Sequence, residues 1–151
     1  MTIKTQPAIN LLCFSTETSL IGLGQFVRVK ASEIYNEAVK SNLEITGPIY
    51  WIYYGMDGYP ETNFKLDIGV PVQKSKTTSN GFSCKTFEKM EFATCIHVGS
   101  WEKFPQSYAV LIKEIMDSGR SLNGITREVY INIDFDNPEN NLTEIQLGLV
   151  S

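Results

Sequence analysis

Cysteine and histidine are scarce in this sequence, and the few that occur are not spaced for joint chemistry. The cysteines are Cys13, Cys84 and Cys95, an odd set without a Cys-x-x-Cys pair, which favours reduced thiols over a disulfide framework. His97 is the only histidine, so neither an ordinary zinc site nor a Ser–His–Asp arrangement has local support. We therefore expect no metal, no cofactor, and a structural His97 with a hydrogen-bonded ring.

The sequence also lacks a strongly basic stretch and a long hydrophobic run. Its formal net charge is −4, which disfavours direct nucleic-acid binding because such binding depends on clustered Lys and Arg. No apolar run approaches the roughly 20 residues that span a bilayer. Residues 1–7 do not show the charged and then apolar pattern of a signal peptide. These absences predict a cytoplasmic protein that binds neither nucleic acid nor membrane.

What the sequence does contain is an internal repeat with an offset of 77 positions, as between Gly124 and Gly47 or between Tyr130 and Tyr53. The matches continue without a gap for about fifty positions. Units copied in this way usually pack side by side. A body built from two similar halves has a seam between them, and ligands are commonly bound at such seams.

The repeat suggests how the chain is organised. Its 151 residues include 42% hydrophobic and 20% charged residues, which suits a single globular domain over 1–151. The polar stretch 73–83, which contains Asn80-Gly81, has no hydrophobic period and is interpreted as the connection between the copies. The first repeat is then expected at about 8–72 and the second at about 84–150.

Each repeat is predicted to run strand, helix, strand, strand. In the second repeat, Pro105 suits the first turn of a helix and Gly119 its end. The closing strands alternate apolar residues, and we expect those faces to lie beneath the helices. The pattern predicts an α+β fold: an antiparallel sheet with both helices on one face. The apolar helix stripes are Ile34, Tyr35, Ala38 and Val39 in the first repeat, and Tyr108, Leu111, Ile112, Ile115 and Met116 in the second.

The strand 49–54 is unusual because neither of its faces is polar. If Tyr50, Ile52 and Tyr54 pointed toward the helices, Trp51 and Tyr53 would point away and would need shielding from water. The matching strand of the second repeat would add Tyr130 and Glu128 to the outward face, where Glu128 occupies the position of Trp51. This predicts a ligand cavity on the face away from the helices, lined by Trp51, Tyr53, Tyr130 and Glu128.

The residue types in this set favour a positively charged aromatic or lipophilic ligand. An aromatic face attracts a cation by about 0.5–2 kcal/mol. A carboxylate in a semi-apolar cavity loses solvation, so it either takes up a proton or is stabilised by a cationic ligand. The alternative is that Trp51 and Tyr53 form a second core or a dimer interface, with Glu128 paired to a nearby base such as Arg127.

Several motifs occur in a characteristic order. His97-Val-Gly-Ser-Trp101 precedes the second helix, Gly-Ile-Thr-Arg-Glu-Val-Tyr follows it at 124–130, and Thr-Glu-Ile at 143–145 opens the closing strand. Over essentially the whole chain, this order resembles the GyrI-like domain, the effector-binding domain of AraC-type and MerR-type regulators. The resemblance implies a two-copy fold that binds lipophilic cations in a central cavity. It also implies that Glu128 is the counter-charge and that Glu144 lies near the cavity rim.

The sequence departs from the family pattern in two ways. It shows no helix-turn-helix region, and the closing strand reads Leu-Gly-Leu-Val at 147–150 where Pro-Val is usual. The leading hypothesis is a stand-alone, multidrug-type binding protein that senses or sequesters small molecules, and the resemblance implies a link to transcription regulation. The resemblance leaves two alternatives open. One is a hydrolase of cyclopropane-type alkylating compounds with Glu128 as base, and the other is a module that binds a protein partner such as DNA gyrase.

Overall fold

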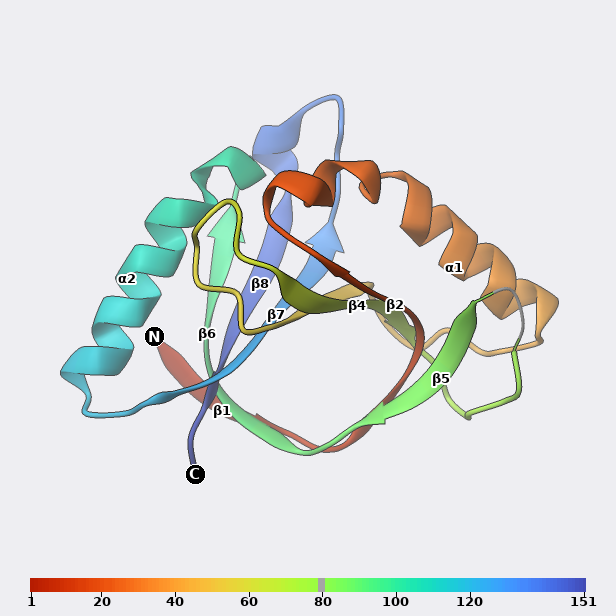
Figure 1. Ribbon diagram of the computed structural model, residues 1–151, viewed down its shortest axis with the longest axis horizontal. Coiled ribbons are helices and arrows are strands. Elements are labelled where there is room, and N and C mark those ends of the chain that lie inside the picture. Colours follow the sequence, from red (N-terminus) through yellow and green to blue (C-terminus); the bar gives the residue numbers. More distant parts are fainter. Residues whose placement is uncertain (79–80) are drawn as a thin grey trace.

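The computed structural model describes residues 1–78 and 81–151, and it contains one open antiparallel sheet with two helices (Figure 1). Eight strands pair in the order β1-β6-β8-β7-β3-β4-β2-β5. The α+β class expected from the sequence is thus confirmed. The strands are β1 (Thr2–Gln6), β2 (Ile9–Thr18), β3 (Tyr50–Tyr54), β4 (Phe64–Pro71), β5 (Phe82–Phe87), β6 (Met90–Val98), β7 (Leu122–Asn132) and β8 (Leu142–Leu149).

The two halves of the sheet share one element order. The first half runs β2, α1, β3, β4 and the second runs β6, α2, β7, β8, and the halves join where β3 pairs with β7. The strand before each half pairs with the other half, β1 with β6 and β5 with β2. Because β5 begins at Phe82, it overlaps the end of the connection predicted at 73–83. The turn expected at Asn80-Gly81 lies partly outside the described residues.

Both helices, α1 (Val29–Lys40) and α2 (Phe104–Asp117), lie on the same side of the sheet (Figure 1). As expected, Pro105 lies in the first turn of α2, and Gly119 follows its end with a φ of 78°. The buried face of each helix is narrower than the stripe of apolar residues predicted from the sequence. Val39 and Met116 are 72% and 70% exposed, because they lie at the outer edges of helices that contact the sheet along one line only.

Both faces of the central strands are buried, which explains why strand 49–54 has no polar side. On the helix side, Trp51 and Tyr53 join the cluster beneath α1. On the other side, Ile52 packs with Leu11, Cys13 and other apolar residues. The end of β1 also reaches this second face, where Gln6 Nε2 donates a hydrogen bond to Tyr50 Oη at 3.1 Å.

The predicted facing of strand 49–54 is therefore wrong. The register pairs Trp51 with Ile68 of β4 on one side and with Glu128 of β7 on the other, and directly paired residues share a face. Ile68 lies under α1, so Trp51 and Glu128 point toward the helices. Side chains alternate along a strand, so an error of one residue inverts the whole strand. The expected cavity on the face away from the helices is accordingly corrected to the helix side.

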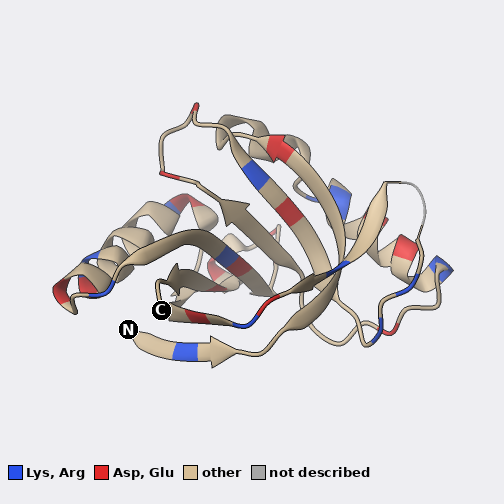
Figure 2. Cartoon of the chain, turned by 60° about the horizontal axis from the view of Figure 1, so that its bottom comes forward, with Lys and Arg blue, Asp and Glu red and all other residues tan. Residues whose placement is uncertain are grey.

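Charged residues of both signs are interspersed along the strands that Figure 2 shows.

Within residues 1–78 and 81–151, no helix combines the length and apolar character that crossing a membrane requires.

Candidate ligand-binding site

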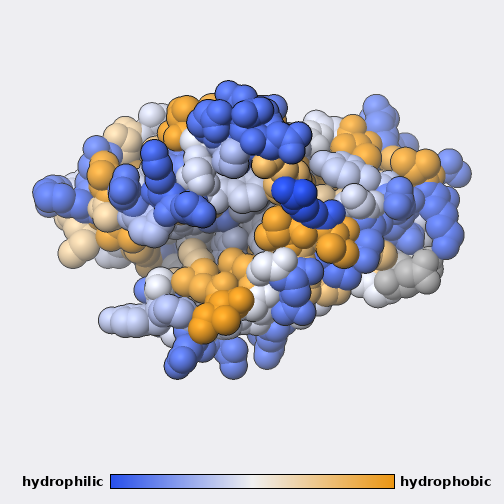
Figure 3. Space-filling model, turned by 90° about the horizontal axis from the view of Figure 1, so that it is seen from above, coloured by the Kyte–Doolittle hydropathy of each residue, from blue (hydrophilic) through white to orange (hydrophobic). Residues whose placement is uncertain are grey.

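A cavity of about 670 Å³ lies between the helices and the central strands. Seen from the helix side, the surface is hollowed between hydrophobic groups (Figure 3). The volume of the cavity falls within the range of about 300–1,000 Å³ that is typical of pockets for drug-sized ligands. Its wall is mostly apolar, and both halves of the chain contribute aromatic residues to it: Phe26, Trp51, Tyr53, Trp101, Phe104, Tyr108, Tyr130 and Phe135.

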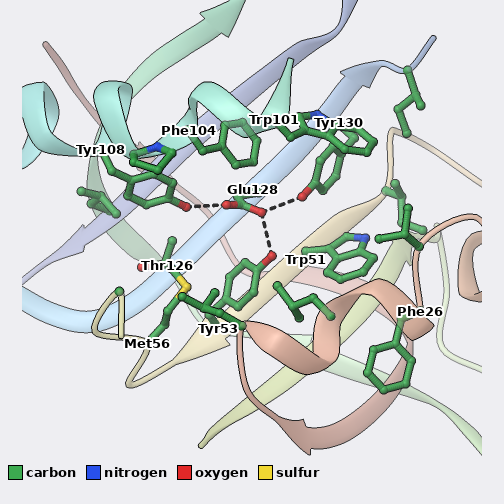
Figure 4. A pocket seen from close by; sticks show the side chains of 18 of the residues that line it. Phe26, Trp51, Tyr53, Met56, Trp101, Phe104, Tyr108, Thr126, Glu128 and Tyr130 are labelled. Carbon is green, nitrogen blue, oxygen red and sulfur yellow. Dashed lines mark hydrogen bonds between the residues drawn. The ribbon is translucent and has the colours of Figure 1, made fainter. Parts of the chain in front are cut away.

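Glu128 lies in the middle of this aromatic set, where three tyrosine hydroxyls point at its carboxylate (Figure 4). Tyr53 Oη donates to Oε1 at 2.7 Å and Tyr130 Oη donates to the same oxygen at 2.6 Å. Tyr108 Oη, from α2, donates to Oε2 at 2.5 Å. The three tyrosines thus hold the carboxylate in one orientation between the two halves.

Burial controls the electrostatics of the group. Only 4% of Glu128 is exposed, and this loss of hydration raises the pKa of its carboxyl above the ordinary value. The tyrosine hydrogen bonds and the nearby His97 lower that pKa in part. Burial, followed by the adjacent carboxylate, raises the pKa of Tyr53, Tyr108 and Tyr130 well above the usual tyrosine value, so these hydroxyls keep their protons.

Among the residues that the structure describes, no basic side chain forms an ion pair with Glu128. Arg127, the partner suggested by the alternative interpretation of the sequence, lies on the opposite face of the sheet. There its Nη1 donates to Gln6 Oε1 at 3.4 Å. The carboxylate at the cavity wall therefore lacks the cation that would offset its burial.

Rings line the cavity from Glu128 toward its rim. Tyr130 contacts Trp51 and Trp101 edge to face, with centroids 6.2 and 5.4 Å apart. Trp101 then contacts Phe135 in the same way, at 5.9 Å. Trp101 is fixed by a hydrogen bond of 3.2 Å from its Nε1 to Thr143 Oγ1. The wall therefore offers ring faces and edges to a ligand.

His97 has the structural role that the sequence predicted. It is buried, and its ring lies 4.8 Å from that of Phe104, a residue of the cavity wall. Its Nε2 is 2.8 Å from the carbonyl oxygen of Ser100, which can only accept a hydrogen bond, so Nε2 donates. Its Nδ1 is 2.7 Å from Ser107 Oγ. Both ring nitrogens therefore have partners.

Glu144 does not lie at the cavity, and the rim position that the family resemblance implied for it is corrected. The register pairs it with Val129, so it shares the face opposite Glu128. There its carboxylate accepts hydrogen bonds from Thr94 Oγ1 at 2.9 Å and Gln146 Nε2 at 3.0 Å. The alternation of β8 would have shown this, because Ile145 is the neighbour that points toward the helices.

Sequence reasoning placed Trp51, Tyr53, Glu128 and Tyr130 together, and all of them line the cavity. It missed the contribution of the helix side. Tyr108 was interpreted only as part of a core stripe, although its hydroxyl at the end of an apolar side chain was a signal of a buried polar partner. Among the described residues, no group of three or more His, Cys, Asp or Glu side chains is arranged to hold a metal ion.

Replacing Glu128 with glutamine should stabilise the protein at neutral pH. The raised pKa in the folded state contributes stability that is fully present below the ordinary carboxyl pKa and is lost as the pH rises through the folded value. Glutamine stays neutral. Its amide nitrogen can donate a hydrogen bond to Tyr108 Oη, while its amide oxygen still accepts the hydrogen bonds from Tyr53 and Tyr130. We therefore expect a higher Tm for Glu128→Gln than for the wild type in thermal melts at pH 7.

The pH series supplies the control for this stability prediction. The difference in Tm should disappear below about pH 4, where the carboxyl is protonated in both the folded and the unfolded chain. A variant that is less stable than the wild type at pH 7 would contradict the view that the ionised carboxylate is costly.

Comparison with known proteins identifies the family to which the chain belongs. The family model of the GyrI-like small molecule binding domain matches residues 1–150. No match was found among curated protein sequences. Among solved structures, the C-terminal domain of EcmrR is similar at a TM-score of 0.80 with 20% identity, over 99% of this chain and 96% of that one. In the structure of EcmrR with DNA, the similarity covers 98% of this chain and 56% of the longer one.

Two further structures share the fold. SAV2435, solved with bound tetraphenylphosphonium, is 13% identical at a TM-score of 0.66 over 99% of this chain and 93% of that one. A hydrolase encoded by lin2189 from Listeria innocua is 15% identical at a TM-score of 0.69 over 99% and 91%. At these identities the likeness shows the fold alone, whereas the family model covers almost every residue. The chain belongs to the family of GyrI-like small-molecule-binding domains.

Proposed function

We propose that this chain binds lipophilic aromatic cations in the cavity between its helices and its sheet, as a sensor or a sequestering protein. The ligand's positive charge would lie near Glu128, and its rings would pack against Trp51, Tyr53 and Tyr130. The relation to a regulator's effector domain supports a sensing role, and the finding of tetraphenylphosphonium in SAV2435 supports the ligand class.

One observation carries the proposal: the carboxylate of Glu128, a residue that is only 4% exposed, faces a largely apolar cavity with several aromatic rings, and no described basic residue forms an ion pair with it. A charge in this position destabilises the empty protein unless something compensates it. The tyrosine hydroxyls compensate in part, since the pKa of Glu128 stays raised in their presence. A cation in the cavity would provide the missing charge, and water excluded by its rings would strengthen the attraction.

The interaction energies expected for a ligand in this cavity are sufficient for binding in the micromolar range. Burying about 250 Å² of apolar ligand surface contributes roughly 6 kcal/mol at about 25 cal/mol per Å². Each well-placed ring adds about 0.5–2 kcal/mol for a cation. The loss of translational and rotational freedom offsets part of this gain, so we expect a dissociation constant near the micromolar range.

A matched pair of ligands tests the proposal on the wild-type protein. Methyltriphenylphosphonium is a cation, and triphenylphosphine oxide has nearly the same shape without net charge. Isothermal titration should show the cation binding at least about tenfold more tightly, a difference of about 1.4 kcal/mol. Repeating the titration at high salt should change the ratio little, because a buried pair is poorly screened. Equal affinity for the two compounds would count against Glu128 as the counter-charge.

A further inference from the structure

Arg28 is a second charged residue of the cavity lining and has no role in the proposal so far. It immediately precedes α1 with a φ of 69°, a left-handed conformation that is unfavourable for a residue other than glycine. Its guanidinium carbon lies 3.9 Å from the centre of the Phe135 ring. Backbone strain of this kind persists where the surrounding structure maintains it, and it is frequent at ligand-binding positions.

The contact with Phe135 links the two halves at the rim of the cavity. Arg28 belongs to the first half, and Phe135 lies between β7 and β8 in the second. From Phe135, successive ring contacts pass through Trp101 and Tyr130. The hydroxyl of Tyr130 ends the series on the carboxylate of Glu128. One aromatic wall thus has a cation at its outer end and an anion at its inner end.

The guanidinium keeps its hydrogen-bond donors available. In the part of the chain that the structure describes, no carboxylate or carbonyl group accepts a hydrogen bond from Arg28. Asp57 also lines the cavity, but its oxygens accept hydrogen bonds within their own turn, from the Tyr59 amide and from Thr62 Oγ1, both at 3.0 Å. Stacking on a ring leaves the edge of a guanidinium free, and that edge matches a carboxylate or sulfonate group.

We propose that Arg28 extends the ligand class to zwitterions: aromatic cations that carry an anionic group on the side that faces the rim. The positive centre would lie near Glu128 and the anionic group would pair with the edge of Arg28. The inference rests on the proposed binding of cations in this cavity. Arg28 is exposed, so its pairing is worth less than a buried contact, and its effect is on selectivity among cations.

The test uses two phosphonium probes that differ at the end of one arm. (4-Carboxybutyl)triphenylphosphonium carries a carboxylate there, and pentyltriphenylphosphonium carries a methyl group. The wild-type protein should bind the carboxylate compound at least as tightly as the pentyl compound. In Arg28→Gln the affinity ratio should shift about fivefold against the carboxylate compound, and Arg28→Lys should restore part of the ratio.

Lys30 offers a matched control, because it also lies over a ring, that of Phe14 at 4.1 Å, but does not line the cavity. Lys30 is in the first turn of α1, two residues after Arg28, and its Nζ also pairs with Glu33 at 2.7 Å. Lys30→Gln removes one positive charge close to Arg28 in the chain and should leave the ratio as in the wild type. An unchanged ratio in Arg28→Gln, or an equal shift in Lys30→Gln, would overturn the role of Arg28 while cation binding stands. Failure of the wild type to bind even the pentyl compound would instead refute the proposed function itself.

Discussion

Glu128→Gln is expected to weaken methyltriphenylphosphonium binding by roughly 30-fold or more at neutral pH, while triphenylphosphine oxide changes by no more than about twofold. Removing one partner of a close, desolvated charge pair typically costs about 2–5 kcal/mol. The substitution preserves size, and glutamine can satisfy the three tyrosine hydroxyls, so the shape of the cavity is kept. Titration of both ligands against both proteins measures the effect.

The pH dependence of binding provides an independent measurement of the same charge. Since protonation and cation binding compete for the carboxylate, the affinity of the wild type should fall as the pH is lowered through the raised pKa of Glu128. The variant should show no such fall. Equal losses for the charged and the neutral ligand in Glu128→Gln would indicate a change of shape, and the charge-matching role would then be rejected.

The fold was predictable because its signals are periodic and occur twice. The alternation in β4 and β8 identified the faces beneath the helices, and Pro105 and Gly119 marked the helix ends within a residue or two. Strand order was not contained in these signals. The exchange of β1 and β5 between the halves depends on pairing over long distances in the chain, which no local pattern specifies.

The composition of the site was more predictable than its place in the fold. A lone carboxylate among aromatic residues indicated Glu128, Trp51, Tyr53 and Tyr130 correctly as neighbours. The face was wrong because β3 is apolar on both sides, so the period of two that fixes orientation was missing from that strand. Pairing it with the alternating β4 would have resolved the choice, since Trp51 is opposite Ile68.

Trp51→Ala should impair stability and binding together, because Trp51 belongs to the core beneath α1 and also lines the cavity. Truncating a buried tryptophan typically costs about 3–5 kcal/mol. The cavity beside it already removes some contacts, so we expect the lower end of that range. Loss of the indole ring from the wall should lower the affinity for the phosphonium cation and for the neutral phosphine oxide by about tenfold or more each, because both ligands lose a ring contact and apolar burial.

Two further variants separate the roles of Trp51. Trp51→Phe keeps a ring at the wall and should recover most of the binding of both ligands. Tyr59→Ala removes a ring that is 70% exposed and does not line the cavity, so it should leave the binding of both ligands unchanged. The sequence alone posed core and cavity as alternatives for Trp51. Loss of stability with unchanged binding in Trp51→Ala would assign it to the core alone, whereas a combined loss requires that one side chain serves the core and the ligand at once.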